Sequence, residues 1–140
     1  MNIREAGAVE LIDLLIGNGV GIELGVATAA DMRMAIEAGA VPRCKRLLVE
    51  VEGEASEAMI EIAAIEAQLV EANLEANLGL PRLDHGYSRA TYAVIDRAVR
   101  VGHDYRIGFE DTLILPDGRP ARSNAELVTV CRARTEGDRR

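Results

Sequence analysis

Apolar residues recur along the chain at two spacings, and the two spacings alternate. In one kind of stretch they lie three or four residues apart, which is typical of one face of an α-helix. The first four helical stretches run from Glu5 to Ile16, from Thr28 to Gly39, from Glu54 to Leu78 and from Thr91 to Val101. The last begins at Ser123 and carries Leu127, Val128 and Cys131 on its inner face. Glycine or proline closes most of them, so each is predicted to be a separate helix.

Short apolar runs lie between the helical stretches and predict strands. These runs are Val20–Leu24, Arg46–Val51, Arg82–Gly86 and Tyr105–Phe109. The third is short, and its place in the alternation indicates a strand more than its composition does. Strands joined by helical crossovers are parallel, and such crossovers are right-handed. The order of a helix and four strand–helix units therefore predicts an α/β chain with one parallel sheet.

Two helix starts carry capping residues. Thr28 precedes Asp31 by three residues, and Ser123 precedes Glu126 by three, so both starts are predicted to be capped. In the helix from Thr91 to Val101, Arg97 is predicted to point outward. The folded domain is expected over residues 1–134, followed by a polar tail over 135–140.

Two architectures fit this order. One is a small open sandwich of four parallel strands. The other is half of a (β/α)8 TIM barrel, with helices outside, whose full form takes about 250 residues. The length of 140 residues favours the sandwich, whereas the residues at the strand ends favour the barrel.

Each predicted strand ends in a charged or titratable residue. These residues are Glu23, Glu50 with Glu52, Asp84 with His85, and Glu110 with Asp111. In parallel α/β folds the carboxyl ends of the strands converge and carry the chemistry. A solvated loop charge explains one such residue, but for four strands a shared site is the more economical explanation.

The fourth strand is the most informative. Alternation places Arg106, Gly108 and Glu110 on one face, with Asp111 just beyond the end. A buried arginine needs a carboxylate partner, which Glu23, Glu110 or Asp111 could supply. Spacing alone leaves two interpretations open, a structural salt bridge and a catalytic pair.

Composition excludes several classes. A formal charge of −7 and 3% aromatic residues argue against nucleic-acid binding. No apolar run approaches the ~20 residues of a membrane span, and the start shows no signal peptide, so we expect a cytoplasmic protein without membrane contact. Cys44 and Cys131 are expected to be reduced core thiols. The glycines form no phosphate-binding motif.

The two histidines are too far apart in sequence to form a metal-binding pair. His85 follows a strand and precedes a glycine, which suits a ligand or a general acid, although lone histidines are more often structural. His103 lies at the amino end of the last strand and is expected to be a turn residue.

The C-terminal part resembles a known family. The segments that carry the resemblance are Gly102–Thr112, Leu115–Ala121 and Ser123–Val128, and together they are long enough to be specific. They resemble the C-terminal end of the β-keto acid cleavage enzymes, the 3-keto-5-aminohexanoate cleavage proteins and their relatives. Gly21–Val26 is similar to the fifth strand of that family, and Leu83–Gly86 to its seventh.

The resemblance implies a fold, a reaction and site residues. The family's members are (β/α)8 barrels that bind a divalent metal, usually zinc, and transfer the acyl part of a β-keto acid to the CoA of acetyl-CoA, releasing acetoacetate. Carried over by position, Glu110 would be a metal ligand. Arg106 and Asp111 would be the pair that takes a proton, with Glu23 polarising that pair.

The departure from the family is equally clear. Its other two zinc ligands are a His-x-His pair near the second strand, and this sequence contains no His-x-His. The chain aligns from the helix after the fourth barrel strand onward. We therefore expect that it needs a missing N-terminal half, and that alone it binds zinc weakly and has little activity.

Three hypotheses follow. The chain is the C-terminal half of a β-keto acid cleavage enzyme, which we favour. Alternatively, it is a non-catalytic half-barrel that self-associates and so buries its open sheet edges. Finally, it could be a small α/β module that binds an acidic or keto metabolite without turnover.

Overall fold

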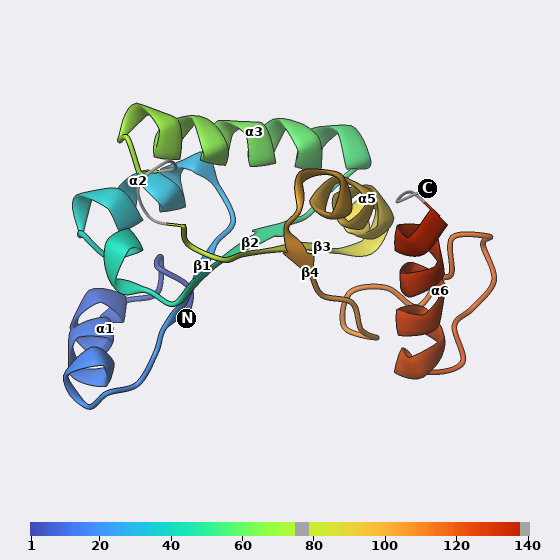
Figure 1. Ribbon diagram of the computed structural model, residues 1–140, viewed down its shortest axis with the longest axis horizontal. Helices are drawn as coiled ribbons and strands as arrows, with labels where there is room; N and C mark the ends of the chain where they lie inside the picture. Colours follow the sequence, from blue (N-terminus) through green and yellow to red (C-terminus); the bar gives the residue numbers. More distant parts are fainter. Residues whose placement is uncertain (75–78, 138–140) are drawn as a thin grey trace. The chain divides into compact units, whose positions relative to one another are not determined.

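The computed structural model describes residues 1–74 and 79–137, and it is an α/β fold (Figure 1). Helices and strands alternate, and the four strands form one sheet in the order β1-β2-β3-β4. This is the predicted fold class, four parallel strands with helices outside, as in half of a TIM barrel. The elements are α1 Ala8–Gly17, β1 Glu23–Val26, α2 Ala29–Glu37, β2 Arg46–Val51, α3 Ala55–Glu71, β3 Arg82–Gly86, α5 Thr91–Val101, β4 Asp104–Tyr105 and α6 Asn124–Gly137.

The chain divides into two compact units. The first comprises Met1–Glu50 with Ile60–Arg82, and the second Val51–Met59 with Leu83–Arg140. Each unit contains a parallel strand pair. The pair in the first unit is β1 with β2, and the pair in the second is β3 with β4.

In the first unit, residues at the chain start lie beside β1. The Gly25 N–H donates to the Met1 carbonyl at 2.7 Å, and the Ile3 N–H donates to the Gly25 carbonyl at 3.1 Å. Beneath them is a core of fully buried side chains that includes Ile12, Leu24 and Met32. These two hydrogen bonds pair the outer edge of β1 with the backbone of Met1 and Ile3.

In the second unit, α5 and α6 pack together through apolar side chains. Ile95 and Ala98 of α5 are fully buried, as are Leu127 and Cys131 of α6. At the surface, Arg134 of α6 pairs with Asp96 of α5 at 2.5 Å. This packing places the start of α6 beside the loop that follows β4.

Most predicted elements are confirmed, and β2, β3 and α5 have the predicted bounds. β1 begins three residues later than predicted, at Glu23, because Val20 lies in the exposed turn after α1. The helix α3 ends at Glu71. The last part of its predicted range, residues 75–78, lies outside the described residues.

The prediction for the fourth strand was wrong. It was expected over Tyr105–Phe109, whereas β4 ends at Tyr105. The reason is a turn in which the Gly108 carbonyl accepts hydrogen bonds from the Asp111 N–H at 3.0 Å and the Thr112 N–H at 3.2 Å. Residues 106–108 are therefore irregular and residues 109–111 form a turn, so the segment has no strand-like alternation of faces.

The cap at Thr28 is confirmed. Its side chain accepts from the Asp31 N–H while the Asp31 carboxylate accepts from the Thr28 N–H, which forms a complete capping box. At α6 the Ser123 hydroxyl accepts from the Glu126 N–H as predicted. The carboxylate of Glu126 instead accepts from the N–H of Arg122.

The C-terminal helix α6 extends to Gly137. It therefore includes the first residues of the segment expected as a polar tail, and residues 138–140 lie outside the described residues. Within the described ranges, 1–74 and 79–137, no helix combines the length and the apolar character that crossing a bilayer requires.

Candidate functional site

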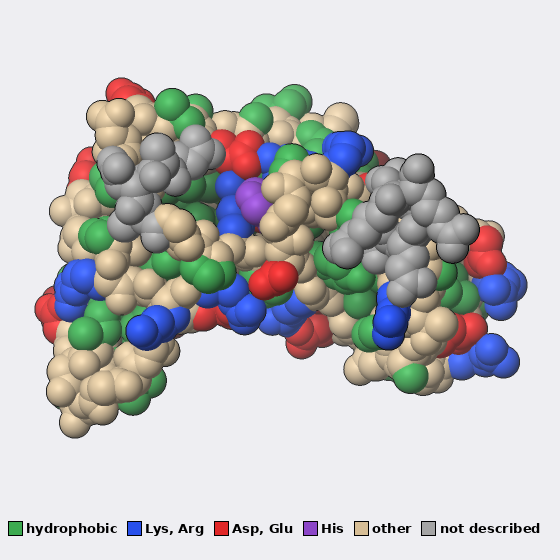
Figure 2. Space-filling view, viewed as in Figure 1, with side chains coloured by type: hydrophobic (Ala, Val, Ile, Leu, Met, Phe, Trp, Pro, Cys, Tyr) green, Lys and Arg blue, Asp and Glu red, His purple; other side chains and the backbone are tan. Residues whose placement is uncertain are grey.

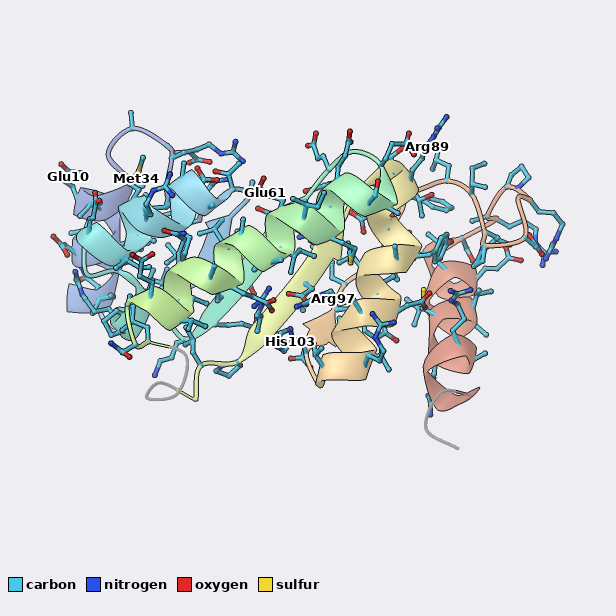
Figure 3. All side chains as sticks on the ribbon, turned by 90° about the horizontal axis from the view of Figure 1, so that it is seen from above. Glu10, Met34, Glu61, Arg89, Arg97 and His103 are labelled. Carbon is cyan, nitrogen blue, oxygen red and sulfur yellow. The ribbon has the colours of Figure 1, made fainter. Side chains whose placement is uncertain are left out.

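Strand β3 sends two neighbouring side chains to opposite faces. Asp84 is fully buried, and its Oδ2 accepts from Nη1 of Arg97 at 3.1 Å and contacts Nδ1 of His103 at 3.0 Å. Figure 3 shows Arg97 and His103 close together beside α5. Asp84 therefore belongs to a buried charge cluster between β3 and α5, and it does not share a site with His85.

This cluster corrects one prediction and adds a contact to another. Arg97 was expected to point outward, but its side chain is only 14% exposed because it reaches Asp84. His103 lies between α5 and β4, where the sequence predicted a turn residue, and its ring also contacts the Asp84 carboxylate. Both residues stabilise a buried negative charge that would otherwise be costly.

The neighbouring side chain, His85, forms the most buried polar pair of the second unit. Its Nε2 lies 2.5 Å from Oδ1 of Asp111, and both side chains are fully buried. The ring of Tyr87 packs on the imidazole with 4.3 Å between ring centres. A histidine and a carboxylate in contact away from water are a common arrangement for proton transfer.

The backbone on both sides fixes the position of Asp111. Its N–H donates to the Gly108 carbonyl, and its own carbonyl accepts from the Ser88 N–H at 2.7 Å. Among the described residues, its second carboxylate oxygen, Oδ2, is buried without a hydrogen-bond partner. Asp111 therefore presents one engaged and one unengaged oxygen.

Arg106 and Glu110 form an ion pair across the turn after β4. The guanidinium is 38% exposed and the carboxylate 64% exposed, so the expectation of a buried arginine inside a strand was wrong. Of the three predicted partners, Glu110 is the one that the turn brings to Arg106. The turn thus places this exposed pair directly beside the buried Asp111.

Glu23 lies at the start of β1 in the first unit. It accepts a hydrogen bond from Nε of Arg46 on β2, and its side chain is 33% exposed. Of the other predicted strand-end carboxylates, Glu50 lies within β2 and Glu52 follows it. Glu50 is half-buried and Glu52 is exposed.

A cleft of about 320 Å³ lies in the second unit beside the ends of β2 and β3. Its lining consists of Glu52, Gly53, Glu54, Glu57, Tyr87, Ser88 and Arg89. Two links connect it to the buried pair, namely the Tyr87 ring on His85 and the bond between the Ser88 N–H and the Asp111 carbonyl. Its charges are partly compensated, because Arg89 pairs with Glu54 at 2.8 Å.

Figure 2 shows acidic and basic side chains interspersed over the visible face of the described residues. This mixture agrees with the pairing of many carboxylates with arginine. An example is Glu66, which accepts from the nearly buried Arg82 at 2.9 Å.

A zinc site is not assembled by the described residues alone. Among them, no three histidine, cysteine or acidic side chains lie together in a way that could hold a metal ion. Glu110 is ion-paired with Arg106 and largely exposed. Since a catalytic zinc takes three protein ligands, these residues do not fit the ion by themselves.

The two cysteines are free and buried, as the sequence predicted. Burial raises the pKa of Cys44, and it raises the pKa of Cys131 to about 11. Both are therefore protonated at neutral pH and behave as apolar core groups.

Sequence reasoning missed two pairings in this site. The alternation of β3 could have separated Asp84 from His85, because neighbouring residues of a strand face opposite sides. No sequence signal joins His85 to Asp111, since they are 26 residues apart and meet only through the fold.

Four parallel strands with outer helices define a fold class, that of half of a TIM barrel, in which ligand sites lie at the carboxyl ends of the strands. Within that class, residues 84–137 match the family model of the beta-keto acid cleavage enzyme. The matched segment contains His85, Arg106, Glu110 and Asp111, and it includes the motifs on which the resemblance rests. A search of curated proteins finds no match to this chain.

Proposed function

We propose that this chain is the C-terminal half of a metal-dependent β-keto acid cleavage enzyme and acts together with a missing N-terminal half. The observation that carries the proposal is the family match over residues 84–137, which includes the segment from Arg106 to Asp111. The fold supports it, because four parallel strands with outer helices correspond to half of a barrel.

The proposed reaction exchanges acyl groups between two molecules. The acyl group R–CO of a β-keto acid R–CO–CH₂–CO₂⁻ passes to the sulfur of CoA. The acetyl group of acetyl-CoA joins the remaining CH₂–CO₂⁻ fragment as acetoacetate. One carbon–carbon bond breaks and another forms, so the reaction needs no oxidant. The family's 3-keto-5-aminohexanoate reaction is one case of this exchange.

We propose that Asp111 accepts a proton and that Arg106 stabilises negative charge while one carbon–carbon bond breaks and another forms. Asp111 offers a buried oxygen without a hydrogen-bond partner among the described residues, which suits a proton acceptor. Arg106 cannot give up its proton in ordinary surroundings, so we assign to its guanidinium the stabilisation of enolate-like charge. Glu23 is proposed to polarise this pair, and its bond to Arg46 would compete with that role.

Glu110 is proposed as one metal ligand, with the other ligands supplied by the missing half. A bound zinc would polarise the keto oxygen of the substrate. The residues of this chain do not complete that site, so activity is expected only from the assembled protein. Acetyl-CoA is the proposed co-substrate.

The experiment combines the chain with a polypeptide that carries the first four strands and the His-x-His pair of a β-keto acid cleavage enzyme. We expect the mixture, and neither half alone, to bind stoichiometric zinc and to form acetoacetate from a β-keto acid and acetyl-CoA. The matched variants are Asp111→Asn, which should abolish turnover, and Asp117→Asn in an exposed turn, which should not.

Three results would contradict the proposal. A chain that dimerises alone and excludes the added half would favour the self-associating half-barrel. A monomer that binds the keto acid without product would favour the binding module. Stoichiometric zinc and full turnover in the isolated chain would show that no second half is needed.

A further inference from the structure

We infer that His85 is the positioning residue of Asp111: its ring N–H holds Oδ1 and thereby leaves Oδ2 as the oxygen that accepts the substrate proton. The catalytic part of this inference rests on the proposed function, and its structural part rests on the geometry of the second unit. It concerns a residue that the family resemblance, as carried over by position, leaves without a role.

The first step is the direction of the hydrogen bond. The proposed base form of Asp111 is the ionised carboxylate, which has only acceptor atoms, so in that form Nε2 of His85 is the donor in this 2.5 Å contact. Charge-assisted bonds of this kind are short and roughly twice as strong as neutral ones. The bond therefore distinguishes the two oxygens of Asp111, which are otherwise equivalent.

The second step is that the remaining freedom of Asp111 is small. The Gly108 carbonyl and the Ser88 N–H hold its backbone, as described above. The β3 backbone positions His85, and the Tyr87 ring packs on the imidazole. With the backbone held, the side chain can still rotate about its Cα–Cβ and Cβ–Cγ bonds, and the hydrogen bond from His85 restrains both rotations.

The third step concerns the surroundings of Oδ2. A Cβ placed on Gly108 would lie 3.9 Å from this oxygen and 3.8 Å from Oδ1 of Asn124. Oδ2 thus faces the Gly108 backbone, in the turn that carries Arg106 and Glu110. The restrained oxygen is engaged with His85 of β3, and the unengaged oxygen is buried beside Gly108.

A purely structural role for the pair is the competing interpretation, and the chain contains a matched control. His103 also contacts a buried aspartate of the same unit, Asp84, but on the α5 face of β3. If buried histidine–aspartate pairs serve stability alone, the two histidines should respond alike to substitution. If the inference holds, substitutions at His85 affect turnover and those at His103 do not.

The structural part is tested by NMR on the isolated chain, which contains only two histidines. We expect a ring N–H of His85 that is protected from exchange and whose proton and nitrogen shifts move in Asp111→Asn. Unchanged shifts in that variant would overturn the inference, whatever the activity of the protein.

The catalytic part is tested in the chain combined with the His-x-His half. His85→Leu removes the donor, whereas His85→Gln keeps an N–H near the same position. We expect His85→Leu to lower kcat by about 10- to 100-fold, within the range that a positioned base contributes. KM should change little, and His85→Gln should recover most of the loss. His103→Leu should leave kcat unchanged.

The outcomes separate the two proposals. No turnover by the wild-type mixture overturns the proposed function and, with it, the catalytic part of this inference. Turnover by the wild type that is equally fast in His85→Leu overturns the inference alone. If His85→Leu does not fold, His85→Gln and the NMR comparison with Asp111→Asn test the inference instead. A His85→Gln variant that loses as much turnover as Asp111→Asn would also contradict the inference.

Discussion

Replacing Asp84 with alanine removes a carboxylate oxygen that contacts both Arg97 and His103. Its Oδ2 contacts Arg97 at 3.1 Å and His103 at 3.0 Å, and the carboxylate is fully buried. Removing one partner of a buried ion pair costs about 3–5 kcal/mol, because the other charge stays buried. We expect a loss near the lower end, about 3 kcal/mol, since Arg97 is 14% exposed and can recruit some water.

The size of this loss can be graded with further variants. Asp84→Asn keeps an oxygen for one donor and loses the charge, so we expect about 1–2 kcal/mol. Asp84→Leu combined with Arg97→Leu removes both charges and should recover part of the loss. Asp96→Ala breaks the exposed pair with Arg134 and should cost less than about 1 kcal/mol.

The assay is denaturant unfolding of the 140-residue chain, followed by circular dichroism, with the free energy of unfolding extrapolated to water. A thermal scan should show Asp84→Ala melting about 10 °C below the wild type. A loss below about 1 kcal/mol, or an equal loss in Asp96→Ala, would refute the reasoning that Asp84 stabilises a buried cluster.

Three further predictions concern stability and reactivity. Gly86→Ala should destabilise the chain by about 1–3 kcal/mol in the same unfolding assay, since its Cβ would lie 2.8 Å from Cγ2 of Val94; unchanged stability would contradict this packing. Thr28→Ala should cost about 1 kcal/mol by loss of the capping box, and a cost equal to zero would show that Asp31 caps α2 alone. Because burial raises the pKa of Cys131 to about 11, its thiolate is scarce below that pH; iodoacetamide followed by mass spectrometry should label it slowly at pH 8 until denaturant is added, whereas fast native labelling would indicate exposure.

The sequence predicted the elements whose ends carry strong local signals. The α5 helix is bounded by Thr91 and Gly102, and β3 follows Pro81, so their limits were readable from residue type. The end of β4 was not readable, because it depends on two backbone N–H groups that bond to the carbonyl of Gly108. The alternation of apolar residues along the sequence does not indicate such a backbone hydrogen bond.

For the candidate site, the sequence brought together those residues that are near each other along the chain. Arg106, Glu110 and Asp111 share one turn, so their association was foreseeable, although the ion pair formed with Glu110 across four residues. The partner of Asp111 was not foreseeable, because His85 reaches it only when β3 and the turn after β4 are in place. Long-range contacts of this kind are set by tertiary packing.

Strand β3 separates two chemistries between its two faces, and this has a consequence for protein engineering. Substitutions at Asp84, Arg97 and His103 should change the melting temperature, with little effect on substrate turnover. Under the proposed function, libraries at His85 and Asp111 should change turnover. The two sets can therefore be randomised in separate rounds, with thermostability first, so that later active-site variants start from a scaffold that tolerates them.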